Sequence, residues 1–170
     1  RGWLPDYWYD AEKAGGGAMM DLGCHPMYMA SYLLGKPKRI ASMFNNTCAP
    51  NGVDDNAVSV VEFENKAIAV LETGFIAPYH GECFELLGTK GAIVLEDGRI
   101  KMRTASFDGG WYCPDKLPKQ QSPAIRQWLD GIEKGTPIPF DLEHALALTE
   151  LLENAYKSDR EQKIVEVPDK

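Results

Sequence analysis

The stretch NAVSVVEFEN, residues 56–65, alternates in the manner of a β-strand. Its two faces would carry different side chains: Ala57, Ser59, Val61 and Phe63 on one, and Val58, Val60, Glu62 and Glu64 on the other. In a sheet with one solvent-exposed face, apolar and polar residues alternate strictly. Here Val58 and Val60 make the second face apolar as well. We therefore expect helices of this chain to cover one face, and a second subunit or another domain to cover the other.

Similar short stretches, rich in branched and aromatic residues, flank this strand on both sides. They are residues 39–46, 67–76, 82–89, 92–97 and 99–104. The links at 64–66, 89–91 and 96–98 have the length and composition of hairpin turns. Consecutive strands with such short links predict an antiparallel meander rather than βαβ units.

Helical patterns lie before and after the strands. Residues 18–34 have apolar positions at helical spacing and stop at Gly35, while Pro26 permits a kink or a late helix start. Ser122 and Pro123 are expected to open a second helix as N-cap and first residue, and Asp141 to cap a third. The spacing gives each of these two an apolar face: Ile125, Trp128, Leu129 and Ile132 in the second, and Leu142, Ala145, Leu148, Leu152 and Ala155 in the third.

Residues 1–14 and 104–121 have no period, and we expect them to be irregular. KIVEV, residues 163–167, could add one more strand. The chain is thus predicted to have an α+β fold, in which an open, mainly antiparallel β-sheet carries helices on one face.

The composition limits the possible partners and compartment. A chain of 170 residues is long enough for one domain with a core, over residues 1–170. A net charge of -7 without a basic stripe argues against nucleic acid, and no apolar run could cross a membrane. Four cysteines without a CxxC pair indicate reduced thiols and a cytoplasmic protein. Because the chain starts at Arg1 rather than Met, we expect a fragment or a processed product.

The stretch GGGAMMDLGCHP, residues 15–26, contains the candidate site. On a continuous helix, Asp21 and His25 would lie on one face, where a carboxylate can orient an imidazole that acts as general base. Gly16 and Gly17 would allow a ligand to approach closely. A helix-capping Asp, a half-buried His and a simple turn are the structural alternative. We expect no metal site, since Asp21, Cys24 and His25 lack a fourth ligand at a useful spacing.

Other residues give weaker signals. One group of aromatic side chains could stack on a sugar or simply pack: Trp3, Tyr7, Trp8, Trp111 and Tyr112. His80 and His144 stand alone, and surface or capping roles are expected for both. Cys24 could be a reactive thiol, although an inert buried cysteine is the simpler interpretation. The sequence has no nucleotide-binding loop of known type.

Three stretches together resemble a known family. GGGAMMDLGCHPMYMASYLLG, residues 15–35, is similar to the central helix of the C-terminal domain of the Gfo/Idh/MocA oxidoreductases. LLGTKGAIVLEDG, residues 86–98, resembles a hairpin of that domain, and residues 140–167 resemble its last helix and closing strand. The resemblance covers nearly the whole chain.

The resemblance implies the substrate-binding and oligomerisation domain of an NAD(P)-dependent oxidoreductase for a sugar, cyclitol or related polyol. The N-terminal Rossmann domain, which binds NAD or NADP in this family, would be absent. His25 would be the catalytic acid/base and Asp21 its partner carboxylate. Gly16, Gly17, Tyr7 and Trp8 would contribute to the substrate site.

Several points stay open at this stage. Many members have an Asp where this chain has Tyr28, so the substrate is not determined. Neither the choice of NAD or NADP, nor the reaction direction, nor the number of subunits follows from the sequence. A non-catalytic, cofactor-binding regulator of the same family is one alternative, and an autonomous binding or assembly module is another. A homo-oligomer formed through the open sheet face is the expected assembly.

Overall fold

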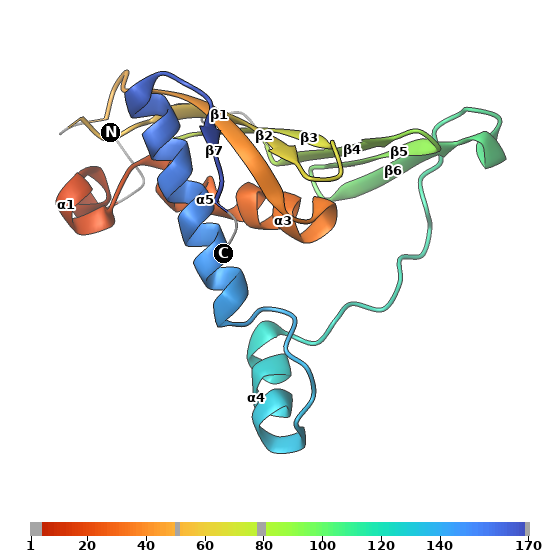
Figure 1. Cartoon of the computed structure of the whole chain (residues 1–170). Coiled ribbons are helices and arrows are strands. Elements are labelled where there is room, and N and C mark those ends of the chain that lie inside the picture. Colours follow the sequence, from red (N-terminus) through yellow and green to blue (C-terminus); the bar gives the residue numbers. More distant parts are fainter. Residues whose placement is uncertain (1–4, 50–51, 78–80, 169–170) are drawn as a thin grey trace. The chain divides into compact units, whose positions relative to one another are not determined.

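A computed structural model describes residues 5–49, 52–77 and 81–168 (Figure 1). The chain divides into two compact units. The first comprises residues 1–77 and 139–170, and the second comprises residues 78–138.

The first unit is built on a four-stranded antiparallel sheet with the order β3-β2-β1-β7. Its strands are β1 (Pro37–Asn45), β2 (Asn56–Phe63), β3 (Ile68–Gly74) and β7 (Val165–Glu166). The register places Val60 between Ala41 and Val70. These strands confirm the predicted stretches, including the short one near the C-terminus.

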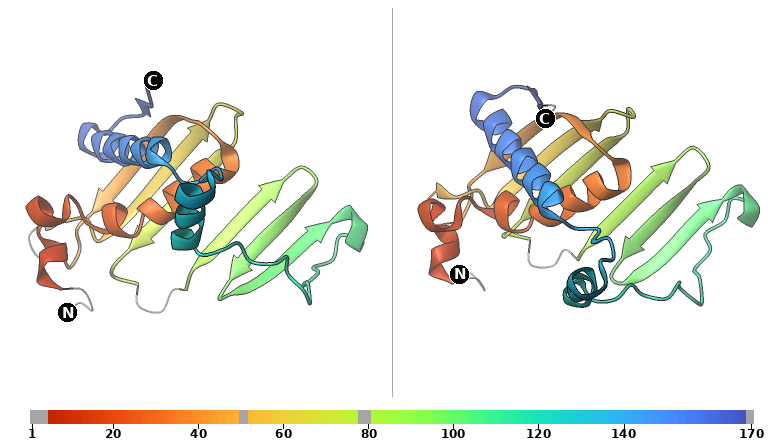
Figure 2. Two further views of the ribbon diagram at one scale, coloured as in Figure 1. Left: turned by 90° about the horizontal axis from the view of Figure 1, so that it is seen from below. Right: turned by 60° about the horizontal axis from the view of Figure 1, so that its bottom comes forward.

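Helices cover one face of this sheet. They are α2 (Ala18–Asp21), α3 (Cys24–Leu34) and α5 (Leu142–Glu161), while η1 (Asp6–Tyr9) and α1 (Ala11–Ala14) precede them in the chain. In Figures 1 and 2, α3 and α5 lie across the same side of β1, β2 and β3. The core lies between these two layers, and its buried residues are Met19, Met27, Ala30, Ile40, Ala57, Val61, Phe63, Leu71, Leu151, Leu152, Ala155 and Val165. The predicted α+β arrangement is therefore confirmed.

The two faces of β2 differ as the sequence indicates. The face that carries Ala57, Ser59, Val61 and Phe63 is buried under the helices. Burying a side chain such as Phe63 stabilises the fold by about 1.5–3 kcal/mol. The opposite face, which we call the outer sheet face, is open in the isolated chain: Val60, Val70 and Met43 are 39%, 68% and 71% exposed.

The C-terminal end of α5 is bonded to β1. The Ser42 N–H donates to Ser158 Oγ at 3.0 Å, and the Phe44 N–H donates to Asp159 Oδ1 at 2.7 Å. The short strand β7 pairs with Arg39 and Ile40 of β1. The backbone N–H groups of Ser42 and Phe44 lie beyond the end of β7, so side chains of α5 accept their hydrogen bonds instead.

Some local expectations need correction. Residues 18–34 form two helices, separated at Leu22 and Gly23, and Pro26 lies in the first turn of α3, where its missing N–H costs little. Residues 5–14 contain two short helical segments where we expected irregular structure. Ser122 is not an N-cap, because α4 (Ala124–Lys134) begins two residues later and has no capping side chain.

The second unit contains a three-stranded antiparallel sheet with the order β4-β5-β6. Its elements are β4 (Cys83–Gly88), β5 (Gly91–Glu96), β6 (Arg99–Thr104), η3 (Ala105–Phe107) and α4. Val94 is the single buried residue among residues 81–138. The predicted apolar face of α4 is largely exposed, with Ile125 and Ile132 each at 63%.

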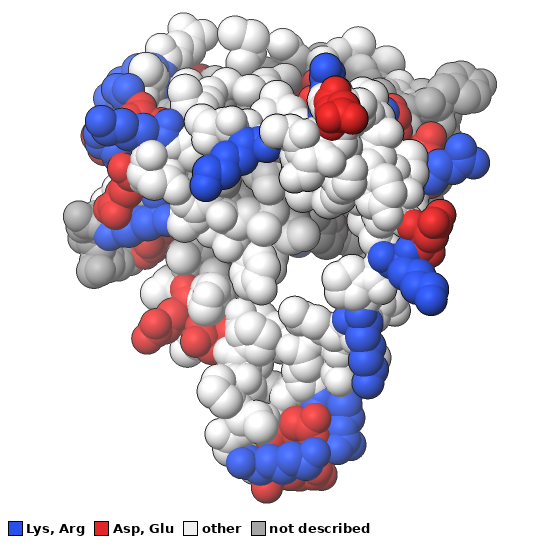
Figure 3. Space-filling view, turned by 90° about the vertical axis from the view of Figure 1, so that its right-hand side faces the viewer, with Lys and Arg blue, Asp and Glu red and all other residues white. Residues whose placement is uncertain are grey.

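One face of the molecule shows how charged side chains are distributed on it. The face drawn in Figure 3 has acidic and basic side chains interspersed, with uncharged residues over most of its area. Within the described part of the chain, no helix is long and apolar enough to cross a membrane.

Candidate functional site

The glycine run begins where α1 ends. Asp10 caps the start of α1 by accepting hydrogen bonds from the N–H groups of Glu12 and Lys13. Gly15 then ends this helix with φ 79°, a left-handed conformation that favours glycine. The chain can therefore reverse, and it enters the buried positions Gly16 and Gly17.

Asp54 accepts hydrogen bonds from the backbone N–H groups of Gly17, Ala18 and Met19. Its Oδ1 accepts from Gly17 N at 2.9 Å, its carbonyl oxygen from Ala18 N at 2.7 Å, and its Oδ2 from Met19 N at 2.7 Å. The first N–H groups of a helix lack partners within the helix, and a side chain at the N-cap usually supplies one. Since Gly17 has no side chain, Asp54 supplies the capping oxygens of α2 from a distant part of the chain.

Tyr156 of α5 completes this arrangement. Its hydroxyl donates to Asp54 Oδ1 at 2.8 Å and accepts from Gly17 N at 3.1 Å. Burial, together with the charge of Asp54, raises the pKa of the Tyr156 phenol far above its usual value, so the hydroxyl keeps its proton.

The glycines are required by this packing. A Cβ on Gly17 would overlap the backbone of Asp54, and a Cβ on Gly16 would overlap the Tyr156 hydroxyl. The space beside both Cα atoms is thus filled by this chain itself. Their predicted contact with substrate remains a prediction.

Asp21 and His25 lie on either side of the break between α2 and α3. The Asp21 N–H donates to Gly17 O at 3.0 Å, which joins this residue to the glycine run. Burial raises the pKa of the Asp21 carboxyl, while the nearby charge of His25 acts in the opposite direction. The two side chains are therefore electrostatic neighbours although the helix between them is not continuous. The His25 side chain is exposed, so a ligand can reach it.

Cys24 lies between them and is half-buried. Its Sγ donates to the Asp21 carbonyl oxygen at 3.0 Å. Burial and the charge of Asp21 raise the pKa of the thiol, which favours the inert interpretation of this cysteine. Among residues 5–49, 52–77 and 81–168, no group of three or more His, Cys, Asp or Glu side chains could hold a metal ion.

The aromatic candidates fall into separate groups. Tyr7 and Trp8 contact each other, with ring centroids 5.4 Å apart, and their role in substrate binding remains a prediction. In the second unit, Lys101 lies over Trp111 at 5.4 Å, and Tyr112 stacks on Phe107 at 4.6 Å. Trp3 and His80 lie outside the described residues. His144 is exposed, as expected, and its Nδ1 lies 2.7 Å from Oδ1 of Asp141, the residue that caps α5.

Sequence reasoning missed Asp54 and assigned no role to Tyr156. The signal for Asp54 was weak, because an acidic pair before a strand is common in loops. Tyr156 follows Ala155 and lies one helical turn after Leu152, so its aromatic side chain is typical of an extension of the apolar face of α5.

The fold and the site define a class of protein: an α+β domain in which an acid–imidazole pair lies where two helices meet, over an antiparallel sheet. Residues 1–94 match the GFO/IDH/MocA C-terminal domain, and the chain belongs to this oxidoreductase family.

Individual relatives agree with this assignment. The uncharacterised oxidoreductase YrbE of Bacillus subtilis (strain 168) is 32% identical over 107 residues, which cover 58% of this chain and 31% of that protein. A dTDP-3,4-didehydro-2,6-dideoxy-alpha-D-glucose 3-reductase of Saccharopolyspora spinosa is 30% identical over 84 residues, or 49% of this chain and 25% of the reductase. The chain thus matches less than a third of the length of either relative.

Solved structures share the fold. Levoglucosan dehydrogenase in complex with NADH and levoglucosan superimposes with a TM-score of 0.85 and 19% identity, over 99% of this chain and 56% of that one. At this level of identity, the likeness shows the fold alone.

Proposed function

We propose that this chain is the substrate-binding domain of an NAD(P)-dependent oxidoreductase that acts on a sugar, a cyclitol or a related polyol. The observation that carries the proposal is the position of Asp21 and an exposed His25 on either side of the break between α2 and α3, next to the buried Gly16 and Gly17. Membership of an oxidoreductase family supports it, as do the sugar reductase and the sugar dehydrogenase among the similar proteins.

The cofactor would be held mainly outside this chain. Among the described residues, no strand leads through a glycine-rich turn into a helix, as a dinucleotide-binding loop requires. The glycine run follows α1 rather than a strand, and the amide of its last residue, Gly17, already donates to Asp54 and Tyr156. We therefore assign NAD or NADP to a preceding domain of the whole protein.

The contribution of this chain concerns the proton. Oxidation of an alcohol requires the hydroxyl proton to leave as the hydride leaves the carbon, and a nicotinamide cofactor supplies the hydride acceptor. His25 would take that proton at an imidazole nitrogen. Asp21 would orient the ring and favour its charged form, as carboxylates do beside catalytic histidines.

Replacing His25 tests this role in the whole protein, with the domain that binds the cofactor present. His25→Ala should lower turnover by ~10²–10⁴, the usual cost of losing a positioned acid/base, and leave nicotinamide binding nearly unchanged. His25→Asn should behave in the same way, because an amide forms hydrogen bonds but cannot carry the proton. Asp21→Asn should cost less than His25→Ala.

Steady-state turnover at saturating sugar decides the outcome. If His25→Ala retains more than about half of the wild-type kcat, the acid/base role is wrong. Cofactor binding without turnover of any sugar in the wild-type protein would favour the regulator of the same family.

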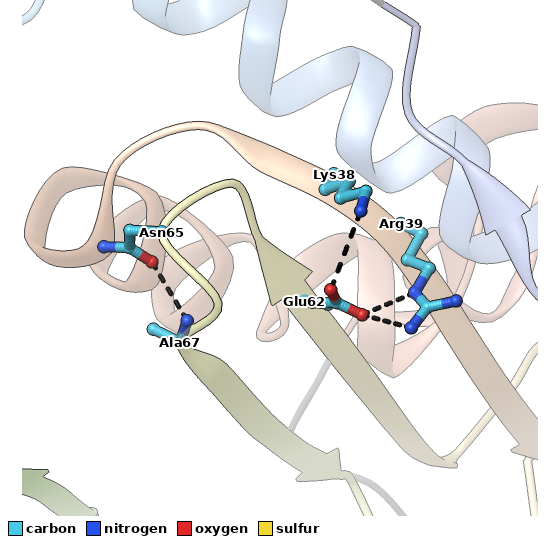
Figure 4. Close-up of polar contacts among 5 residues, drawn as sticks. All are labelled: Lys38, Arg39, Glu62, Asn65 and Ala67. Atoms are coloured by element: carbon cyan, nitrogen blue, oxygen red, sulfur yellow. Dashed lines mark hydrogen bonds and ion pairs between the residues drawn. The ribbon is translucent and has the colours of Figure 1, made fainter.

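We also propose a homo-oligomer in which two outer sheet faces meet. The apolar row Ala41–Val60–Val70 crosses three neighbouring strands, and the exposed side chain of Met43 adjoins it. At one edge, Glu62 pairs with Arg39 and lies 3.9 Å from Lys38 (Figure 4). An apolar centre with a charged rim is typical of an interface.

A reducing, cytoplasmic location fits the four free thiols, of which Cys48, Cys83 and Cys113 are exposed.

A further inference from the structure

We infer that Asp54 and Tyr156, which we name the anchor, position Asp21 and His25 for the proton transfer described above. The inference rests on the proposed function, and it assigns a positioning role to two residues that would touch neither substrate nor cofactor.

The anchor fixes the backbone at consecutive positions. Asp54 accepts the amides of Gly17, Ala18 and Met19 through three different oxygen atoms, at 2.7–2.9 Å. Three directed bonds to adjacent residues leave the start of α2 little freedom to shift or rotate. Asp54 itself is 8% exposed, so water does not compete well for these bonds.

Tyr156 fixes Asp54 in turn. The phenol lies on α5, 102 residues from Asp54 and 139 from Gly17, and it bonds to both. Its ring packs edge-on against Phe44 of β1, with centroids 5.0 Å apart. Through Tyr156, the start of α2 is therefore tied to the long helix and to the sheet.

A short series of bonds leads from the anchor to the proposed site. Gly17 donates its N–H to the anchor and accepts the Asp21 N–H at its carbonyl oxygen. The Asp21 carbonyl oxygen accepts the Cys24 thiol, and His25 is the next residue. A shift at Gly17 would consequently move the Asp21 carboxylate relative to the imidazole.

The test compares two variants of α5 in the whole protein. Tyr156→Phe removes the hydroxyl bonds to Asp54 and Gly17 and keeps the ring. Ser158→Ala is the matched control, because Ser158 is 1% exposed and also has two hydrogen bonds, from Ser42 N at 3.0 Å and to Lys163 O at 2.6 Å. Both variants should lose similar thermal stability. Only Tyr156→Phe should lower kcat, by about tenfold, with the KM for the nicotinamide cofactor unchanged.

Cys24 gives a second readout that does not depend on turnover. We expect iodoacetamide to label this half-buried thiol about threefold faster or more in Tyr156→Phe than in Ser158→Ala, because the junction between α2 and α3 would open more often. Cys48, Cys83 and Cys113 are exposed and should label equally in both, which peptide mass spectrometry can verify. Asp54→Asn should reproduce the effect on Cys24.

The outcomes separate the anchor from the proposed function. Equal labelling of Cys24 in Tyr156→Phe and Ser158→Ala overturns the anchor, whatever the turnover. Faster labelling with an unchanged kcat also overturns it, because the junction would then move without consequence for the reacting groups. If the wild-type protein oxidises or reduces no sugar, cyclitol or related polyol, the proposed function fails, and the labelling result alone decides whether the anchor holds the junction.

Discussion

One carboxylate, next to Asp54 in the sequence, holds the described part of the loop between β1 and β2. Asp55 has no exposed surface and accepts the N–H groups of Thr47, Cys48 and Ala49 at 2.6–2.9 Å. Burial alone would raise the pKa of Asp55, but these backbone donors outweigh it and hold the pKa below the usual value. The loop between β1 and β2 is thus stabilised by the ionised form.

The stability of this loop should therefore depend on pH. Since the folded pKa of Asp55 lies below the unfolded value of about 3.9, its contribution is complete above that pH and is lost as the pH falls through the folded pKa. Asp55→Asn should lower the free energy of unfolding by about 1–3 kcal/mol at pH 7 and by clearly less at pH 3. Urea denaturation measures both values.

An exposed aspartate provides the control. Asp115→Asn should change stability little at either pH, because Asp115 is exposed. A destabilisation by Asp55→Asn that is the same at pH 3 and pH 7 would show that the charge of the carboxylate is not what holds the loop.

At the residue scale, the sequence predicted the candidate pair but not its support. Asp21 and His25 are four residues apart, so the short segment between them keeps them near each other even though α2 ends there. Asp54 and Tyr156 reach Gly17 across 37 and 139 residues. Neither contact has a local pattern, and only the packing of the sheet and α5 brings the three together.

At the scale of elements, the strands were predictable and the break in the first helix was not. Alternation over β2 sorted its residues onto two faces, and the structure shows that the face of Ala57, Ser59, Val61 and Phe63 is the buried one. Apolar spacing over residues 18–34 suggested one helix, yet the N–H groups of Leu22 and Gly23 both donate to Ala18 O and end α2 there. Gly23 is a residue type that often ends helices, but the apolar spacing continues on both sides of it, so the pattern did not mark the end of α2.

The outer sheet face gives a prediction for one strand. Val60→Lys would put a charge in the middle of the apolar row and should dissociate the proposed oligomer. An obligate interface of this type commonly buries more than about 2,000 Å². Thr149→Lys, on an exposed turn of α5, should leave assembly unchanged. Sedimentation velocity compares the variants with the wild type, and a soluble wild-type monomer at high concentration would contradict the proposal.

At the scale of the whole molecule, the two units differ in how much core they have. The first contains the apolar core and the proposed site. The second has Val94 as its single buried residue within 81–138, while Ile93 and Leu95 of β5 are each 37% exposed. A three-stranded sheet needs a covered apolar face for independent stability. We therefore expect the second unit to need packing against other protein surface for stability, because its own strands bury so few side chains.

The isolated chain should not bind the cofactor. Because its described residues lack a dinucleotide-binding loop, we expect calorimetric titration of the purified 170-residue chain with NAD or NADP to give no heat of binding at micromolar concentrations. The whole protein should bind one of the two under the same conditions. Micromolar binding by the chain alone would mean that it holds a nucleotide in a way unlike the known loops.

The close contact at Gly17 also has an evolutionary consequence. Any side chain at this position would collide with the Asp54 backbone, and any at Gly16 with the Tyr156 hydroxyl. A larger residue at position 16 is thus compatible with a smaller side chain at position 156. The clash at position 17 involves backbone atoms that every residue has, so no substitution at position 54 relieves it. Among homologues, we therefore expect positions 16 and 156 to covary, and Gly17 to be lost only where the segment around Asp54 has been rebuilt.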